Sequence, residues 1–125
     1  MGLAMTNLDK IVGNEIHLKD INLELKAGSR NVLLGRTLAG KTSLLRIMAG
    51  LDRPTQGTVS VNGRDVTGVS VRKRSVAMVY QQFINFPSLT VYNNIASPLK
   101  IARVQRKKLD RRVRETAAIL QIDTL

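Results

Sequence analysis

Several features are absent from this chain of 125 residues, and each absence narrows its function. Cysteine is missing, which excludes disulfides and cysteine-ligated zinc or iron–sulfur centres and suits a reducing compartment. His17 is the sole histidine, so a histidine-based metal site or catalytic triad lacks partners, and we expect a plain surface or sheet residue. No apolar run approaches the ~20 residues that span a bilayer, and the N-terminus lacks the pattern of a secretory signal.

Acidic residues are scarce, with 9 against 20 lysines and arginines, which gives a formal net charge of +11. The excess is concentrated between Lys100 and Arg114, where Asp110 is the only acidic residue. Such a stripe could bind nucleic acid or an anionic membrane surface. We favour a solvated helix face, because no aromatic residues are interleaved to stack on bases.

The most informative segment is glycine-rich. Residues 35–43 read GRTLAGKTS and fit G-x-x-x-x-G-K-[ST], the loop that wraps the phosphates of a nucleoside triphosphate. Gly35 allows a tight turn, Gly40 allows close backbone approach, and the loop amides form a nest for the anion. Lys41 would reach the β- and γ-phosphates, and the Thr42 hydroxyl would ligate Mg²⁺. The candidate nucleotide-binding residues of the loop are Gly35, Arg36, Thr37, Leu38, Ala39, Gly40, Lys41, Thr42 and Ser43.

Apolar patterns predict a first half built mainly of strands. Residues 3–8 and 16–25 are expected to be strands around a turn at 12–15, and 58–61 alternates before the hairpin signal Asn62-Gly63. Two continuous apolar runs, 31–34 before the loop and 76–80, predict further strands. The second is of the kind covered on both faces.

Helices are expected after the phosphate loop and in the last third of the chain. Residues 43–49 predict a helix that Gly50 ends, and Thr90 can cap a helix from Val91 that must end near Pro98. A longer helix is expected from about 106 to 121. Its apolar side would consist of Leu109, Val113, Thr116 and Leu120.

Taken together, these segments resemble the ATP-binding subunit of ABC transporters over nearly the whole chain. The anchors are the phosphate loop, LLRIMAGL over 44–51, GTV over 57–59, MVYQ over 78–81 and FPSLTV over 86–91. The resemblance implies an α/β fold with a P-loop nucleotide-binding core of the ABC type and an antiparallel β layer, truncated at the start of the helical subdomain. Residues 1–125 would then be the N-terminal part of one ATPase domain. The core and β layer would occupy about 1–92, and the start of the helical subdomain about 93–125.

The same resemblance implies roles for residues outside the loop. Gln81 would contact Mg²⁺ or the attacking water and would act in catalysis with Lys41, although a polar residue that merely ends a strand is the plainer alternative. The segment from Phe83 to Leu89 would help form the groove that receives a helix of an integral membrane permease. A second nucleotide-binding subunit would complete a dimer around two ATP molecules. A solute-binding protein would be an indirect partner, and the subunit would lie at the cytoplasmic face of the membrane.

Three departures from the family pattern stand out. The place of an aromatic residue that stacks on adenine falls at Val12, which has no π-face. Leu38 stands where many relatives carry glycine, and Arg36 where they often carry proline. Nothing in the chain supplies the LSGGQ-type segment, the strand ending in Asp-Glu or the switch histidine, so the chain by itself is expected to bind MgATP weakly and not to hydrolyse it.

The implied function is ATP binding in an ATPase that powers transport of a small solute. Residues between Gln81 and Pro98 look most like importers of sugars, polyols or glycerol phosphate. Two alternatives stay open: a basic P-loop ATPase associated with nucleic acid, and a regulatory fragment that binds nucleotide without hydrolysis. Nucleic acid is the partner we favour less, for the reason given above.

Overall fold

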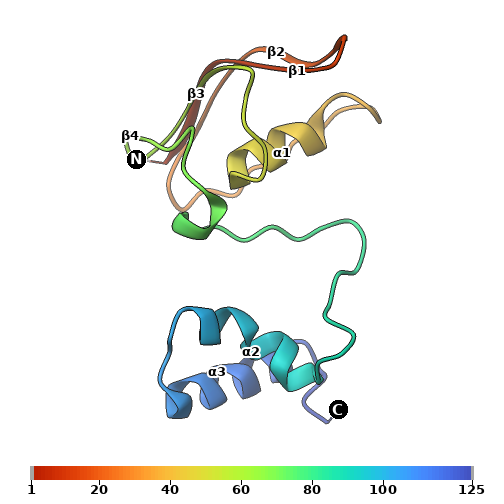
Figure 1. Ribbon diagram of the computed structural model, residues 1–125, viewed down its shortest axis with the longest axis vertical. Helices are drawn as coiled ribbons and strands as arrows, with labels where there is room; N and C mark the ends of the chain where they lie inside the picture. Colours follow the sequence, from red (N-terminus) through yellow and green to blue (C-terminus); the bar gives the residue numbers. More distant parts are fainter. Residues whose placement is uncertain (1, 125) are drawn as a thin grey trace. The chain divides into compact units, whose positions relative to one another are not determined.

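Two long antiparallel strands begin the chain in a computed structural model that describes residues 2–124 (Figure 1). β1 (Leu3–Val12) pairs with β2 (Glu15–Leu25) from the Leu3–Leu25 pair to the Val12–Glu15 pair. The turn is only two residues long, and Gly13 has a φ of 60°. Because so tight a turn lets pairing continue to the tip, both strands are longer than the sequence predicted.

β3 (Gln56–Val61) and β4 (Arg64–Asp65) complete an antiparallel sheet with the order β2-β1-β3-β4. The predicted hairpin between them is confirmed. Asn62 and Gly63 have φ angles of 51° and 76°, so both central residues of the turn are in the left-handed region that a tight hairpin requires.

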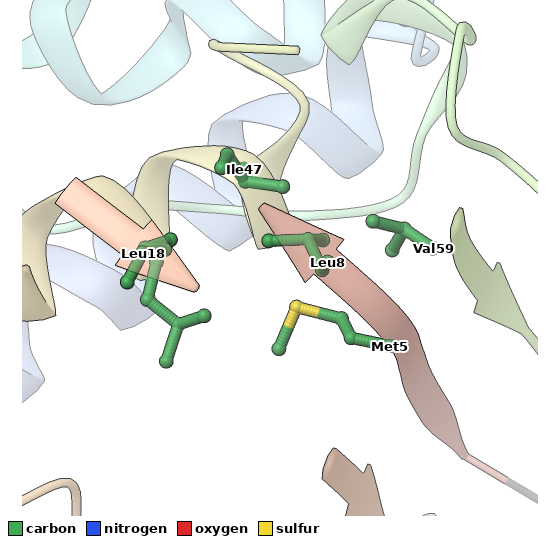
Figure 2. Packing of buried hydrophobic residues seen from close by; sticks show 6 residues of the cluster. Met5, Leu8, Leu18, Ile47 and Val59 are labelled. Atoms are coloured by element: carbon green, nitrogen blue, oxygen red, sulfur yellow. The ribbon is translucent and has the colours of Figure 1, made fainter. Parts of the chain in front are cut away.

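The helix α1 (Lys41–Ala49) packs on this sheet. It begins two residues before the predicted start at 43, and Gly50 ends it as predicted, with a φ of 81°. The helix and three strands share one buried apolar cluster. Figure 2 shows the strand residues gathered beneath the helix residue Ile47. The buried members are Met5, Leu8, Leu18, Leu44, Ile47 and Val59. This cluster fixes α1, and with it the start of the helix that follows the phosphate loop.

The strands predicted at 31–34 and 76–80 are wrong. Both segments are irregular, and their apolar side chains face solvent: Val32 is 83% exposed, Leu34 86% and Val79 96%. An apolar run becomes a strand only when a neighbouring strand satisfies its backbone groups. In residues 2–124 the sheet consists of β1–β4, and none of these strands pairs with either segment.

The chain divides into two compact units, unit 1 up to Val79 and unit 2 from Tyr80 on. Unit 2 contains α2 (Val91–Ile101) and α3 (Arg106–Ile119). The Thr90 side chain accepts a hydrogen bond from the Asn93 amide, which confirms the predicted cap. The predicted end near Pro98 is wrong, because the helix loses only the bond that proline cannot donate, and the Pro98 carbonyl still accepts from Ala102.

The helix pair of unit 2 has a small core of its own. Ala96 of α2 packs with Leu109 and Val113 of α3. The predicted apolar side of this helix is correct for Leu109 and Val113 and wrong for Thr116 and Leu120. Ala117 is buried in place of Thr116, and Leu120 is 58% exposed, because a spacing of four residues continues from Val113.

Within residues 2–124, the structure has no helix both long enough and apolar enough to cross a membrane.

Candidate nucleotide-binding site

The phosphate loop, residues 35–43, is an exposed turn that leads directly into α1. The Ala39 amide donates to the Arg36 carbonyl at 3.1 Å, which closes the turn. Gly40 precedes the helix in the left-handed region, with a φ of 87° and no side-chain cap. The first turn of α1 contains no acidic residue, so its free N–H groups and positive dipole end remain available to an anion.

Lys41 folds its side chain back over the loop. Its Nζ donates to the carbonyl oxygens of Gly35 at 2.6 Å and Arg36 at 2.5 Å. These bonds hold the ammonium against the first two residues of the loop. With Arg36 on the same loop and no carboxylate in residues 35–43, the site is positively charged throughout. The structure therefore places cationic and amide donors together at one helix start.

Gly40 has a structural role that the sequence did not reveal. A Cβ at this position would lie 2.4 Å from the carbonyl oxygen of His17 and 2.9 Å from Cδ2 of Leu18. The loop is thus seated directly on the backbone of β2. Its glycine is required by the protein's own packing as well as by close approach to a ligand.

A side-chain contact also joins β2 to the loop. Nδ1 of His17 lies 3.2 Å from Oγ of Ser43, and Nε2 of the same ring lies 3.6 Å from a carboxylate oxygen of Glu15. His17 is a sheet residue as predicted, but it also touches the candidate site. The contact spans 26 residues of sequence, and no sequence pattern around His17 indicates it.

Leu38 occupies the tip of the loop with a φ of 66° and a side chain that is 99% exposed. Its backbone adopts the conformation that glycine reaches without cost, which agrees with the family's frequent glycine at this place. For a leucine this conformation costs roughly 1–2 kcal/mol. The side chain gains no packing in return, so the strain is not offset locally.

The two candidate residues outside the loop lie in different units. Val12 ends β1 at the tip of the β1–β2 hairpin, 49% exposed and paired with Glu15, two residues before His17. Gln81 lies in unit 2, in an exposed irregular segment that begins that unit. The structure thus places Val12 in the unit of the phosphate loop, and the role of Gln81 is a proposal.

The segment after Gln81 is an exposed apolar loop with a polar anchor. Phe83 is fully exposed and Phe86 is 58% exposed. Asn94 of α2 holds the loop: its Oδ1 accepts from the Phe86 amide at 2.8 Å, and its Nδ2 approaches the carbonyls of Phe86, Leu89 and Thr90 within 3.2 Å. The apolar side chains of the loop are therefore presented outward from a fixed backbone.

Arg74 is not available to an outside ligand. Its guanidinium donates to the carbonyls of Met48 at the end of α1, of Val66, and of Val69 just before the short 3-10 helix η1 (Val71–Lys73). Burial lowers the pKa of this guanidinium from its ordinary value. Arg74 follows two other basic residues, Arg72 and Lys73, and such a run could form part of a nucleic-acid surface. The structure instead uses it to join α1 to the loop that follows β4.

A family model described as "ABC transporter" matches residues 18–124 of this chain. The chain belongs to the ABC transporter family. The match includes the phosphate loop, α1 and both helices of unit 2.

Curated relatives cover several import systems. The chain is 38% identical over its whole length to the sulfate/thiosulfate import ATP-binding protein CysA of Mesostigma viride, and covers 36% of that protein. It is 37% identical to the trehalose/maltose import ATP-binding protein MalK of Thermococcus litoralis, with 99% of this chain and 35% of that protein covered. The Fe(3+) ions import ATP-binding protein FbpC of Vibrio cholerae is 35% identical, with 97% and 34% covered. The chain therefore spans about a third of the length of these relatives.

A solved structure has the same fold. It is a dimeric, post-hydrolysis state of the ATP-binding cassette MJ0796 bound to ADP and Pi, and it superposes with a TM-score of 0.77 at 28% sequence identity. The match covers 90% of this chain and 54% of the other. The predicted ABC-type nucleotide-binding fold with an antiparallel sheet is thereby confirmed.

Proposed function

We propose that this chain binds MgATP through residues 35–43, as part of an ATPase subunit that powers import of a small solute. The observation that carries the proposal is the arrangement of Lys41, whose ammonium is held against the loop turn at the N-terminal end of α1. Triphosphate oxygens would bind the loop amides and this ammonium together. The similar cassette bound to ADP and Pi supports a nucleotide as the ligand.

The loop residues have separate tasks in this proposal. Lys41 neutralises charge that develops on the transferred phosphoryl group, and the amides from Gly40 onward orient it. Thr42 is exposed in the first turn of α1, where its hydroxyl can ligate Mg²⁺, and Gln81 is the proposed second protein ligand. When bound, Mg²⁺ would supply positive charge that offsets the negative charge of the phosphates. Val12 would border the base without stacking on it.

Hydrolysis also requires a group that activates the attacking water, and residues 35–43 contain no carboxylate that could do so. We therefore propose that turnover belongs to a complete domain paired with a second nucleotide-binding subunit. The 125 residues alone would bind nucleotide without hydrolysing it.

Import is proposed from the relatives, whose printed names describe import of sulfate, trehalose or maltose, and iron. The exposed loop from Phe83 to Leu89 would contact an integral membrane permease at the cytoplasmic face, and a solute-binding protein would act only through that permease. A carbohydrate or polyol is our first candidate solute. Oxyanion relatives are equally similar, so radiolabelled maltose and sulfate uptake in a strain lacking the gene is the discriminating assay.

The nucleic-acid alternative is less well supported by the side chains. Arg74 is committed to internal carbonyls, and in the basic stripe Arg114 bonds to Asp110 at 3.0 Å while Arg111 lies 3.8 Å from Glu115. We expect only generic, salt-sensitive binding to DNA.

Binding of MgATP by Lys41→Ala tests the proposal, with Lys19→Ala as a control lysine on β2. Loss of a charge-assisted bond to phosphate should weaken binding about tenfold to a hundredfold, and the control should bind as the wild type does. Equal affinity for all three proteins in calorimetry would reject the phosphate loop as the site.

A further inference from the structure

The ring of His17 bridges two elements that the phosphate loop depends on. It projects from β2 to the first turn of α1, where its Nδ1 lies 3.2 Å from Oγ of Ser43. The side chain is 34% exposed, so it is neither buried in the core nor free in solvent. Ser43 is the last residue of the phosphate loop, one position after the proposed magnesium ligand. A substitution at His17 would therefore affect the nucleotide site through the Ser43 side chain.

The direction of this hydrogen bond determines what Ser43 can offer a ligand. A serine hydroxyl has a single hydrogen, and it also accepts. If that hydrogen pointed to His17, Ser43 would present only lone pairs to a phosphate oxygen. If Nδ1–H donates to Oγ instead, the serine hydrogen is free to donate to the phosphate.

We propose that His17 is a positioning residue of the nucleotide site, which donates from Nδ1 to Ser43 and thereby directs the Ser43 hydroxyl to a phosphate oxygen. The inference rests on the proposed function, because it assumes that triphosphate binds at this loop. His17 acts through Ser43 and does not itself touch the ligand. A bound phosphate anion favours this arrangement, since hydrogen bonds to charged acceptors are the stronger ones.

The backbone supports the same arrangement. The His17 carbonyl lies against Gly40, so β2 contacts the loop at two places, once by main chain and once by side chain. The contact between the His17 carbonyl and Gly40 fixes the distance between β2 and α1. The His17 ring then fixes the rotamer of Ser43. Glu15 lies near the other ring nitrogen, at 3.6 Å, and is 85% exposed. A carboxylate there bears on which ring nitrogen carries the hydrogen, so Glu15 is part of the environment of the ring.

A double-mutant cycle on the full chain tests the proposal. Affinity for MgATP and for magnesium tripolyphosphate is measured by calorimetry for wild type, His17→Phe, Ser43→Ala and the double variant. Each single change should weaken both ligands about tenfold, and the double variant should lose about tenfold, not a hundredfold. His17→Asn, which keeps a hydrogen-bonding group, should recover most of the loss. Lys19→Ala, an exposed position on the same strand, should bind as the wild type does.

Three results would overturn the proposal. His17→Phe with wild-type affinity would show that the contact has no effect on binding. Losses that multiply in the double variant would show that the two residues act independently. A loss confined to MgATP, with tripolyphosphate unaffected, would place His17 against the nucleoside and not behind the phosphates. If His17→Phe fails to fold in circular dichroism, His17→Ala and His17→Asn complete the same cycle.

The control at Lys41 separates this inference from the proposed function. If Lys41→Ala binds MgATP as tightly as the wild type, the site itself is elsewhere and the proposed function fails. If Lys41→Ala loses binding while His17→Phe and Ser43→Ala do not, the site stands and only the role of His17 is rejected.

Discussion

Gly40 and His17 meet so closely that a methyl group on the glycine Cα would stand 2.4 Å from the histidine carbonyl oxygen. The glycine also has a φ of 87°. Position 40 therefore requires both a residue without a Cβ and a left-handed backbone, because the phosphate loop contacts the backbone of β2 there. The same contact determines where α1 begins, because the helix starts at the next residue.

Replacing Gly40 by alanine should destabilise the fold by about 3 kcal/mol, since the clash is with backbone and adds to the cost of a left-handed alanine. Gly28→Ala is the matched control: its φ is 72°, and a Cβ there meets nothing within 4 Å. It should lose only about 1 kcal/mol. Urea unfolding followed by circular dichroism measures both, and equal losses would mean that the loop moves away from β2 at little cost.

Leu38 at the loop tip offers the opposite test. Leu38→Gly should leave the free energy of unfolding within about 0.5 kcal/mol of wild type, because relief of left-handed strain and the greater freedom of the unfolded glycine nearly cancel. Leu38→Val should destabilise by about 1 kcal/mol, since a β-branched residue tolerates this backbone poorly. Neither substitution removes packing, because the Leu38 side chain faces solvent. A valine variant as stable as the glycine variant would show that the tip does not keep its φ of 66°.

Arg74 should be among the most sensitive surface-accessible positions of unit 1. Removing its guanidinium takes the donor from the carbonyls of Met48 and Val69, and one of two donors from Val66, which also accepts from the Val69 amide. Arg74→Ala should therefore cost about 2–3 kcal/mol. Arg74→Lys should recover only part of this, because an ammonium lacks the planar fork. Arg72→Ala, on the exposed side of η1, should change stability by less than about 0.5 kcal/mol. Thermal unfolding of the three variants gives the ranking.

The ion pair between Arg46 and Asp52 should give a pH-dependent contribution. Arg46 donates through Nε at 2.8 Å and Nη2 at 3.0 Å, and this hydrogen bonding holds the pKa of Asp52 below its ordinary value, against the opposing effect of burial. A lowered carboxyl pKa stabilises the fold above the unfolded value and loses that effect as pH falls through the folded one. Asp52→Asn should therefore cost about 0.5–1 kcal/mol at pH 7 and nothing once pH is well below ~4.

Local chemistry in the sequence was sufficient for several parts of this fold. The Asn62-Gly63 turn, the Gly50 stop and the Thr90 cap each depend on one or two residues whose conformational preferences are decisive. The phosphate loop is equally local, since all its donors lie within residues 35–43. Such features can be predicted because the residues that stabilise them lie within the same short segment of sequence.

Other features depend on segments that are distant in sequence. The 31–34 run is apolar enough for a buried strand, but pairing is decided by its neighbours, and no described segment pairs with it. The His17–Ser43 contact and the inward turn of Arg74 are likewise created by packing α1 on the sheet. Ala117 is buried in place of Thr116 because it continues the four-residue spacing of Leu109 and Val113, the α3 residues that pack with Ala96 of α2.

Asn94 provides a test of the apolar loop proposed to contact a permease. Its amide nitrogen faces the carbonyls of Phe86, Leu89 and Thr90, so Asn94→Asp would bring a carboxylate oxygen against three acceptors. The loop should detach from α2, with a loss of about 2 kcal/mol and faster amide exchange at residues 86–90. Asn93→Asp, one residue away, is the matched control and should leave exchange in this loop unchanged. If the proposed contact is correct, Asn94→Asp should also lower co-purification with the membrane subunit while MgATP affinity stays at the wild-type level. Unchanged exchange would show that the backbone of the loop does not depend on Asn94, and reduced MgATP affinity would mean that the loop acts on the nucleotide site as well.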